Sequence, residues 1–267
     1  MWHTRPVRTS PRPAIERACT NGYTRAVKIS IIVPAFNEEK LLGETLAQIK
    51  SAAGALAKTG WETELIVCDN HSTDHTADIA RAAGANVMFE PVNQIARARN
   101  SGAAAATGDW LVFVDADSHP SAGLFADMAK EIQSGKCIAG GATLCWNEKR
   151  FNAKFMMPIL NVGFRCRRML HGPFIFVETA AFQKLGGFNH EAFAGEDWEL
   201  SGRLKKLAKE TGKRLVILHR HPVMTSARRI KHYTVLTAFG ALYHIIFDPH
   251  SFATSRQAAR RLYDGQR

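Results

Sequence analysis

The sequence predicts an α/β fold built on a doubly wound, mostly parallel sheet flanked by helices. Short apolar runs alternate with amphipathic helical segments over the first half of the chain, as expected for a parallel sheet with crossover helices. The runs 65–68 and 110–114 are continuously apolar, which is typical of strands covered on both faces. With 46% hydrophobic residues in 267, the chain can bury a full core.

Each element follows from its periodicity and from the residues that start or stop it. Asn37 and the segment 72–74 are expected to cap the first two helices, and Gly84 to end the second. Residues 146–177 show no periodicity and are expected to be irregular. The expected strands span residues 29–33, 65–68, 87–89, 110–114, 138–144 and 215–218, and the later helices span 95–106, 122–133 and 196–209.

The most informative motif, Asp115-Ala116-Asp117, follows the expected strand 110–114. Ligands of open α/β sheets bind beyond the carboxyl ends of such strands. If the segment is extended, residues two apart point to the same side, so both carboxylates can converge on one divalent cation. Carboxylate oxygens suit Mg²⁺ or Mn²⁺, whose other ligands are commonly substrate phosphates and water. The motif therefore predicts a diphosphate substrate, although two solvated acids on a loop are the alternative.

Charge and cysteine content narrow the class of protein. The formal net charge of +11 indicates acidic partners, namely nucleotide phosphates, anionic lipid or nucleic acid. No recognised nucleic-acid-binding module occurs, so nucleic acid is not an expected partner. The five cysteines are widely spaced without a CxxC pair, which favours reduced thiols in the cytoplasm. Residues 1–27 lack the apolar core of a signal peptide and are expected to form a flexible basic leader.

Four sequence elements together resemble the family 2 glycosyltransferases, inverting enzymes of the GT-A fold that use nucleotide-diphospho-sugars. The resemblance covers about residues 28–229 and rests on the order and spacing of the four. They are Val33-Pro-Ala-Phe-Asn-Glu38, Cys68-Asp-Asn-His-Ser-Thr-Asp74, Ala98-Arg-Asn100 with Asp115-Ala-Asp117, and Gly186-Gly-Phe188 with Gly195-Glu-Asp197. The QxxRW signature of processive members is missing, which favours single sugar additions.

The resemblance implies a nucleotide site at the tips of the first two strands. Asp69 and Asn70 are expected to accept hydrogen bonds from the base, and Asn70 stands where the family more often has a second aspartate. Arg99 matches an arginine that approaches the nucleotide, whereas Arg97 is expected to be an ordinary surface charge. The residues implied to surround the base and ribose are Pro34, Phe36 and Glu38.

The resemblance also implies the roles of the reaction centre. Asp117 would be a main metal ligand, Asp115 would contact ribose or metal, and His119 is a candidate third ligand. Asp197 would be the catalytic base, which a helix N-terminus is expected to keep ionised. The alternative is that Glu196 and Asp197 are only first-turn acids. Arg228 and Arg229 are expected to hold the diphosphate as it leaves.

Residues 28–145 are therefore expected to bind the nucleotide-sugar donor, and 146–230 to supply the base and bind a saccharide or lipid-linked acceptor. The rival interpretations are a sugar-phosphate nucleotidyltransferase, whose glycine-rich first loop is missing here, a basic nucleic-acid-binding protein and a silent homologue. Residues 231–267 are expected to form an amphipathic segment that binds either the inner face of a membrane or the core. Its apolar stripe consists of Leu236, Phe239, Gly240, Tyr243, Ile246 and Phe247.

Overall fold

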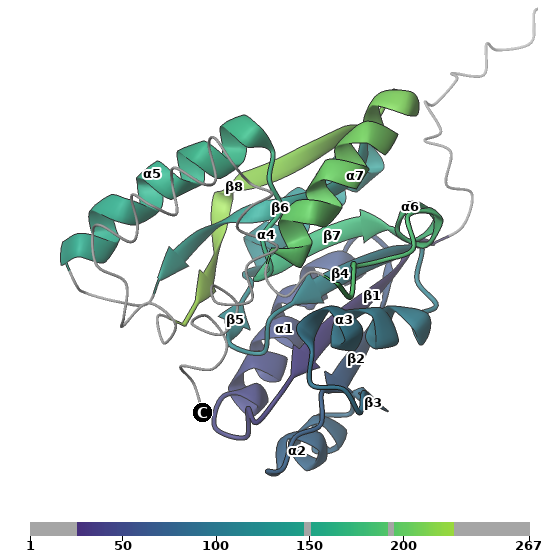
Figure 1. The fold of residues 1–267 in the computed structure, drawn as a ribbon, viewed down its shortest axis with the longest axis vertical. Coiled ribbons are helices and arrows are strands. Elements are labelled where there is room, and N and C mark those ends of the chain that lie inside the picture. The colour runs from purple at the N-terminus through teal and green to yellow at the C-terminus, as the bar shows by residue number, and fades with distance from the viewer. Residues whose placement is uncertain (1–25, 147–150, 192–194, 227–267) are drawn as a thin grey trace, which may run out of the picture.

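The computed structural model describes residues 26–146, 151–191 and 195–226 (Figure 1). Their core is one eight-stranded sheet with the order β3-β2-β1-β4-β7-β6-β8-β5. The strands are β1 (Lys28–Ala35), β2 (Glu62–Asp69), β3 (Asn86–Phe89), β4 (Trp110–Val114), β5 (Ser118–His119), β6 (Cys137–Trp146), β7 (Phe174–Glu178) and β8 (Arg214–Thr225). The helices are α1 (Leu42–Ala57), α2 (Thr76–Ala82), α3 (Ile95–Ala104), α4 (Ala122–Gln133), α5 (Phe151–Arg167), α6 (Thr179–Lys184) and α7 (Glu196–Glu210).

The sheet divides into a parallel half and a mixed half. Strands β3, β2, β1 and β4 run parallel, which confirms the alternating strand and helix pattern of the first half of the chain. Beyond β4, strand β7 is antiparallel to both of its neighbours, and β8 runs parallel to β6. Strand β5 pairs antiparallel with the end of β8. The two halves share continuous pairing, so the candidate residues of both halves are positioned by one sheet.

Two apolar layers hold the helices on opposite faces of this sheet. On one face, α1 and α4 pack on side chains such as Ile31 and Val112. On the other face, α3, α6 and α7 pack on side chains such as Ile32 and Phe113. Alternate residues of β1 and β4 thus belong to different layers, which explains why β4 is an unbroken apolar run and why β1 is apolar from Ile31 to Ala35.

The expectation of an irregular region over 146–177 was wrong. This stretch contains α5 and the buried central strand β7, which pairs with β4 and β6. Helix α5 has Pro158 inside it, which helps to explain why no helical pattern was recognised. The apolar part of β7, Phe174–Val177, is entirely buried but is only four residues long. A short apolar run without alternation does not by itself indicate a strand.

The expected N-cap of the first helix was wrong, whereas Asp74 of the expected second cap accepts the N–H of Thr76, the first residue of α2, at 3.0 Å. Helix α1 begins at Leu42, not directly after Asn37, and neither Leu41 nor His75 caps its helix through a side chain. Asn37 instead has a positive φ of 52° and accepts the N–H of Thr73 at 2.8 Å. The capping-type residues therefore tie the β1–α1 loop to the β2–α2 loop.

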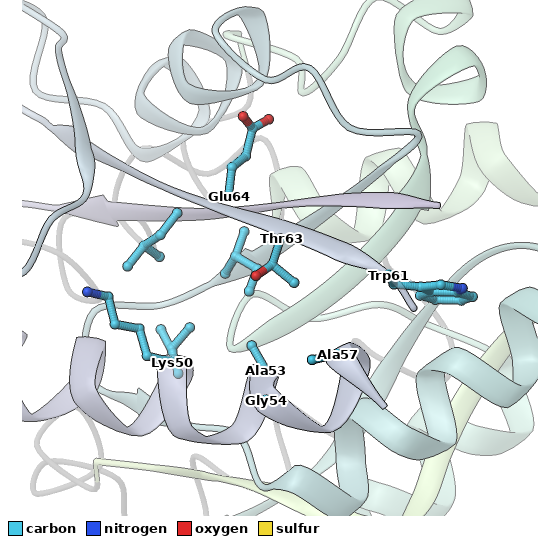
Figure 2. A pocket seen from close by; sticks show the side chains of 10 residues that line it. Lys50, Ala53, Gly54, Ala57, Trp61, Thr63 and Glu64 are labelled. Carbon is cyan, nitrogen blue, oxygen red and sulfur yellow. The ribbon is translucent and has the colours of Figure 1, made fainter. Parts of the chain in front are cut away.

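A cavity of about 170 Å³ lies between α1 and the first half of β2 (Figure 2). Ala53 and Gly54 of α1 line one side, and Trp61 and Thr63 line the other. Trp61 immediately precedes β2 and Thr63 is near its start, whereas Asp69 is its last residue, so the cavity lies at the opposite end of β2 from the expected nucleotide site. None of the predicted site residues lines this cavity.

Candidate active site

The Asp115-Ala116-Asp117 motif lies in a turn, not in an extended segment. Strand β4 ends at Val114, and the Ser118 N–H donates to the Asp115 carbonyl at 3.0 Å. The extended geometry that was expected to align the two carboxylates is therefore wrong. Both acids are nevertheless buried, with 4% of Asp115 and 7% of Asp117 exposed. The alternative interpretation, two solvated acids on a loop, is therefore wrong.

A buried arginine connects the two acidic motifs. The guanidinium of Arg99, on α3, donates through Nη2 to Asp115 Oδ1 at 2.9 Å and through Nη1 to Glu196 Oε1 at 2.7 Å. Its Cζ atom also lies 5.2 Å from the centre of the Phe188 ring. One side chain thus joins the β4 turn to the first turn of α7. The contact of Arg99 with a nucleotide stays a prediction, because these contacts are to protein carboxylates.

Gly172 lets the backbone approach this pair. A Cβ atom at that position would lie 2.5 Å from Arg99 Nη2 and 3.2 Å from Asp115 Oδ2, so a side chain would displace the ion pair. The Gly172 N–H donates to Asp197 Oδ2 at 2.8 Å. The segment between α5 and β7 therefore packs directly on both acidic motifs. The sequence signal for it was Gly172-Pro173 before an apolar run, and it was missed.

Asp197 lies at the start of α7 with both carboxylate oxygens engaged. Besides the Gly172 N–H, it accepts the N–H of Trp198 at 2.9 Å through Oδ1. Burial and the adjacent Glu196 raise the pKa of Asp197 to about 7, against the lowering effects of Arg99 and the two N–H donors. The expectation that the helix N-terminus would hold this acid firmly ionised is thus wrong, because desolvation outweighs the donors.

The expected nucleotide residues gather at the carboxyl ends of β1 and β2. Pro34 is within β1, and Phe36 and Glu38 follow it in the half-exposed β1–α1 loop. Asp69 is the last residue of β2 and accepts the N–H of Ser72 at 3.1 Å. Asn70 is 4% exposed and accepts the N–H of Gln94 at 3.2 Å, which anchors the entry to α3. Their contact with a base remains a prediction.

The end of β8 meets the Asp115–Asp117 turn. The Ser226 N–H donates to the Asp117 carbonyl at 3.2 Å, so the chain leaves β8 beside this acid. Arg228 and Arg229 follow it and lie outside the described residues. His119, on β5, has its Nε2 3.3 Å from the Thr45 hydroxyl. Its role as a metal ligand stays a prediction.

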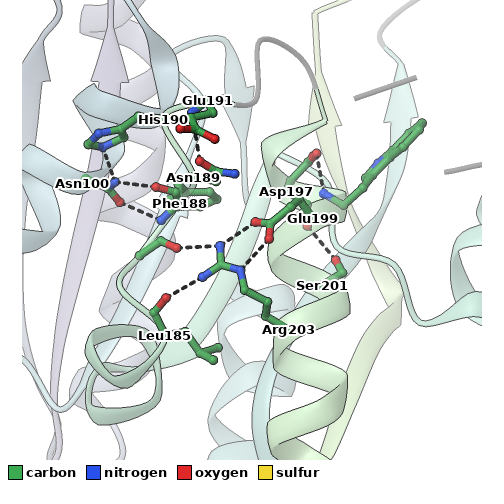
Figure 3. A network of polar contacts seen from close by, with 12 residues as sticks. Asn100, Leu185, Phe188, Asn189, His190, Glu191, Asp197, Glu199, Ser201 and Arg203 are labelled. Atoms are coloured by element: carbon green, nitrogen blue, oxygen red, sulfur yellow. Dashed lines mark hydrogen bonds and ion pairs between the residues drawn. The ribbon is translucent and has the colours of Figure 1, made fainter. Parts of the chain in front are cut away.

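A second polar network fixes the loop before α7 (Figure 3). Arg203 pairs with Glu199 on its own helix and donates to the carbonyls of Leu185 and Gly187 at 2.6 and 2.8 Å. Asn100 both accepts the N–H of Phe188 and donates to its carbonyl. The Gly186-Gly-Phe188 motif is therefore held between α3 and α7. Sequence reasoning did not single out Arg203, whose spacing from Glu199 on one helix face was its signal.

The chain is similar to known proteins over most of its length. A family model described as glycosyl transferase family 2 matches residues 30–190, which is more than half of the chain. The chain belongs to glycosyl transferase family 2. Membership confirms the predicted family and makes the chain a nucleotide-sugar glycosyltransferase. An uncharacterized protein of Methanocaldococcus jannaschii is 27% identical over 241 residues, covering 82% of this chain and 91% of the relative.

Solved glycosyltransferase structures share the fold. The mannosyltransferase PcManGT from Pyrobaculum calidifontis, in complex with GDP-Man and Mn²⁺, superposes with a TM-score of 0.61 at 21% identity, covering 91% of this chain and 80% of that one. S. aureus TarS, residues 1–349 in complex with UDP-GlcNAc, gives a TM-score of 0.59 at 20% identity, covering 89% and 73%. The predicted GT-A architecture is confirmed by this likeness.

Proposed function

We propose that this glycosyltransferase moves a single sugar from a nucleotide-diphospho-sugar to an acceptor hydroxyl with inversion at the anomeric carbon. The observation that carries the proposal is the environment of Asp197. This carboxylate is buried and held by two backbone N–H groups next to the Arg99 ion pairs. A base in this position takes the acceptor proton as the new bond forms, on the face opposite the leaving diphosphate.

The raised pKa of Asp197 suits that task. A general base works best when its pKa lies near the operating pH, because it is then both deprotonated and basic enough to accept a proton. Its pKa of about 7 meets this condition, which an ordinary exposed aspartate does not. The Gly172 and Trp198 N–H groups fix the orientation of the carboxylate. Arg228 and Arg229 are proposed to stabilise the departing nucleoside diphosphate.

The donor is proposed to be bound at the tips of β1, β2 and β4. Nucleotide sugars occupy two structures of the same fold, UDP-GlcNAc in TarS and GDP-Man in PcManGT, which supports this class of donor. Asp69 is the last residue of β2, and Asp115 follows the end of β4. Hydrogen-bond acceptors for the base or ribose and ligands for a cation therefore lie along one edge of the sheet.

The acids fit a loosely held cation. Within the described ranges no group of three His, Cys, Asp or Glu side chains could hold a metal ion. Asp117, with Asp115, would hold Mg²⁺ or Mn²⁺ together with substrate phosphates, which matches how Mg²⁺ binds through one or two carboxylates. The bound cation would offset the negative charge of the diphosphate, which the two acids would otherwise repel.

Donor binding is therefore expected to depend on a divalent cation. In calorimetric titrations with GDP and UDP, the affinity for the preferred nucleotide should fall by more than about tenfold in EDTA and in Asp117→Ala. The matched control is Asp78→Ala, which removes an acid on α2 that is 73% exposed. Equal nucleotide affinity with Mn²⁺, with EDTA and in Asp117→Ala would disprove the metal assignment.

Two rival functions fit the residues of this chain less well. A sugar-phosphate nucleotidyltransferase would form nucleotide sugar from a nucleoside triphosphate and a sugar phosphate. The β1–α1 loop lacks the glycine-rich sequence of those enzymes, which disfavours that reaction. A nucleic-acid-binding protein would account for the net charge of +11 but would leave the buried acids near Arg99 without a role.

The acceptor is proposed to be a saccharide or a lipid-linked molecule. Across the described part of the chain, no helix is long and apolar enough to cross a membrane. The predicted amphipathic segment 231–267 lies outside the described residues. We propose that it binds anionic membrane peripherally and brings a lipid-linked acceptor to the site.

Vesicle co-sedimentation tests this membrane contact. The full chain should sediment with vesicles of anionic phospholipid, less so in high salt, because basic residues beside an apolar stripe attract anionic headgroups. Binding should disappear when the chain is cut after Lys231, while neutral vesicles serve as the control. A truncated protein that no longer folds, as measured by circular dichroism, would instead assign the segment to the core.

A further inference from the structure

His171 lies at the junction of the two acidic motifs without any role in the chemistry above. It immediately precedes Gly172, whose N–H binds Asp197 and whose Cα packs against Arg99 and Asp115. The Phe174 N–H donates to the His171 carbonyl at 3.5 Å, which closes a turn between α5 and β7. The chain thus fixes His171 one residue away from the backbone that touches both acids.

The imidazole is buried in an apolar niche. Only 5% of His171 is exposed, and its ring packs edge-on against Phe164 of α5, with 4.4 Å between the ring centres. Among the residues that the structure describes, neither Nδ1 nor Nε2 has a hydrogen-bond partner outside residue 171 itself. Burial lowers the pKa of His171 to about 4, against smaller opposing effects that include the charge of Asp115. The ring is therefore neutral, with one N–H donor and one acceptor nitrogen.

A buried imidazole of this kind lowers the stability of the fold unless a ligand forms a hydrogen bond with it. A buried polar group without a partner is destabilising, whereas an apolar ring of similar shape beside Phe164 would avoid the penalty. Buried unsatisfied groups in native proteins are rare and commonly mark a functional position. The next residue, Gly172, contacts both Asp115 and Asp197, so a substrate bound at these acids would lie close to residue 171.

We propose that His171 hydrogen-bonds a hydroxyl of the transferred sugar and so helps to determine which donor sugar the enzyme accepts. This inference rests on the proposed function. The diphosphate is placed at Asp115 and Asp117, and the anomeric carbon must face an acceptor activated by Asp197. The transferred sugar would then lie between Asp115 and Asp197, beside Gly172, which contacts both acids. Its hydroxyls would be next to residue 171.

The buried ring requires a small adjustment when the sugar binds. Neither nitrogen is open to solvent, so the imidazole or the Phe164 ring must rotate to admit a hydroxyl. Side-chain rotamer changes of this kind are common on binding. The Gly172 backbone, held by Asp197, need not move, so the donor site can keep its shape while residue 171 engages the sugar.

Paired titrations of nucleotide sugar and nucleotide test the proposal. GDP-mannose and GDP, and UDP-GlcNAc and UDP, are titrated in Mn²⁺ against wild type, His171→Phe and His171→Leu. The ratio of the two affinities isolates the contribution of the sugar from that of the nucleotide. For the donor that wild type binds, both variants should lose about 5- to 100-fold in this ratio, the effect of one unpaired buried hydrogen-bonding group. Affinity for GDP or UDP alone should not change.

The control is His75→Phe, which removes an imidazole whose side chain is 81% exposed and should leave the ratio unchanged. Thermal unfolding should show His171→Phe to be at least as stable as wild type, because two unpartnered nitrogens are removed. If the phenyl ring does not fit, the smaller leucine variant decides. An unchanged ratio in a folded variant overturns the inference alone. Wild type that binds neither these four compounds nor nucleotide sugars with the other bases overturns the proposed function, and the inference with it.

Discussion

Asp197→Asn is expected to abolish sugar transfer while donor binding stays nearly intact. The amide keeps the shape of the side chain but cannot take the acceptor proton. The loss should therefore appear in kcat, at the ~10²–10⁴-fold that general base catalysis contributes. One oxygen can still accept the N–H of Gly172 or Trp198, so the local fold should survive. Transfer is measured as release of nucleoside diphosphate with the acceptor present.

The pH dependence gives an independent reading of the same residue. Because the pKa of Asp197 is raised to about 7, kcat/KM should increase with pH up to about that value and then level off. The stability effect has the opposite direction. Between the unfolded value of 3.8 and about 7, the unfolded chain has released this proton and the folded chain has not, so stability falls as pH rises. At pH 8 the Asp197→Asn variant should unfold at a higher temperature than wild type.

The control is Glu210→Gln, which changes an exposed acid at the other end of α7. It should alter neither the rate nor the pH profile. A variant Asp197→Asn that retains more than about a tenth of the wild-type rate would contradict the role of base, since that role is worth at least ~10²-fold. A variant that no longer binds nucleotide would show a structural role instead.

The sequence was a good guide where function and fold are encoded locally. Asp115-Ala-Asp117 after an apolar run and Gly195-Glu-Asp197 before a helical one are both read from a few neighbouring residues. Their placement at strand and helix ends was therefore predictable. The parallel half of the sheet was predictable for the same reason, because its strands alternate with helices of ordinary length.

The properties that depend on distant contacts were not predictable. Arg99 and Glu196 are 97 positions apart, and nothing in either segment indicates that they pair. The pKa of Asp197 depends mainly on burial, and Gly172, which contacts this carboxylate, lies 25 positions earlier in the chain. Residue type and helix position suggested an acid with an ordinary pKa, whereas the packed environment raises the pKa of Asp197 to about 7. Local rules therefore located the base but could not predict its pKa.

Arg99→Met is expected to destabilise the folded protein by about 3–5 kcal/mol. Removing one partner of a buried ion pair leaves uncompensated charge in the interior, and here the Asp115 and Glu196 carboxylates would both lose their contact with the guanidinium of Arg99. The methionine fills part of the vacated volume, so the effect is mainly electrostatic. Urea unfolding at pH 7, followed by circular dichroism, measures the change in the free energy of unfolding.

Two further variants separate charge from packing. Arg97→Met changes a half-buried arginine on the same helix whose guanidinium contacts Gln94, and it should alter stability by less than about 1 kcal/mol. Adding Asp115→Asn and Glu196→Gln to Arg99→Met removes the stranded charges, so the triple variant should recover much of the lost stability although it cannot be active. A triple variant no more stable than Arg99→Met would show that Arg99 acts through packing, and that the two acidic motifs are not held together by charge.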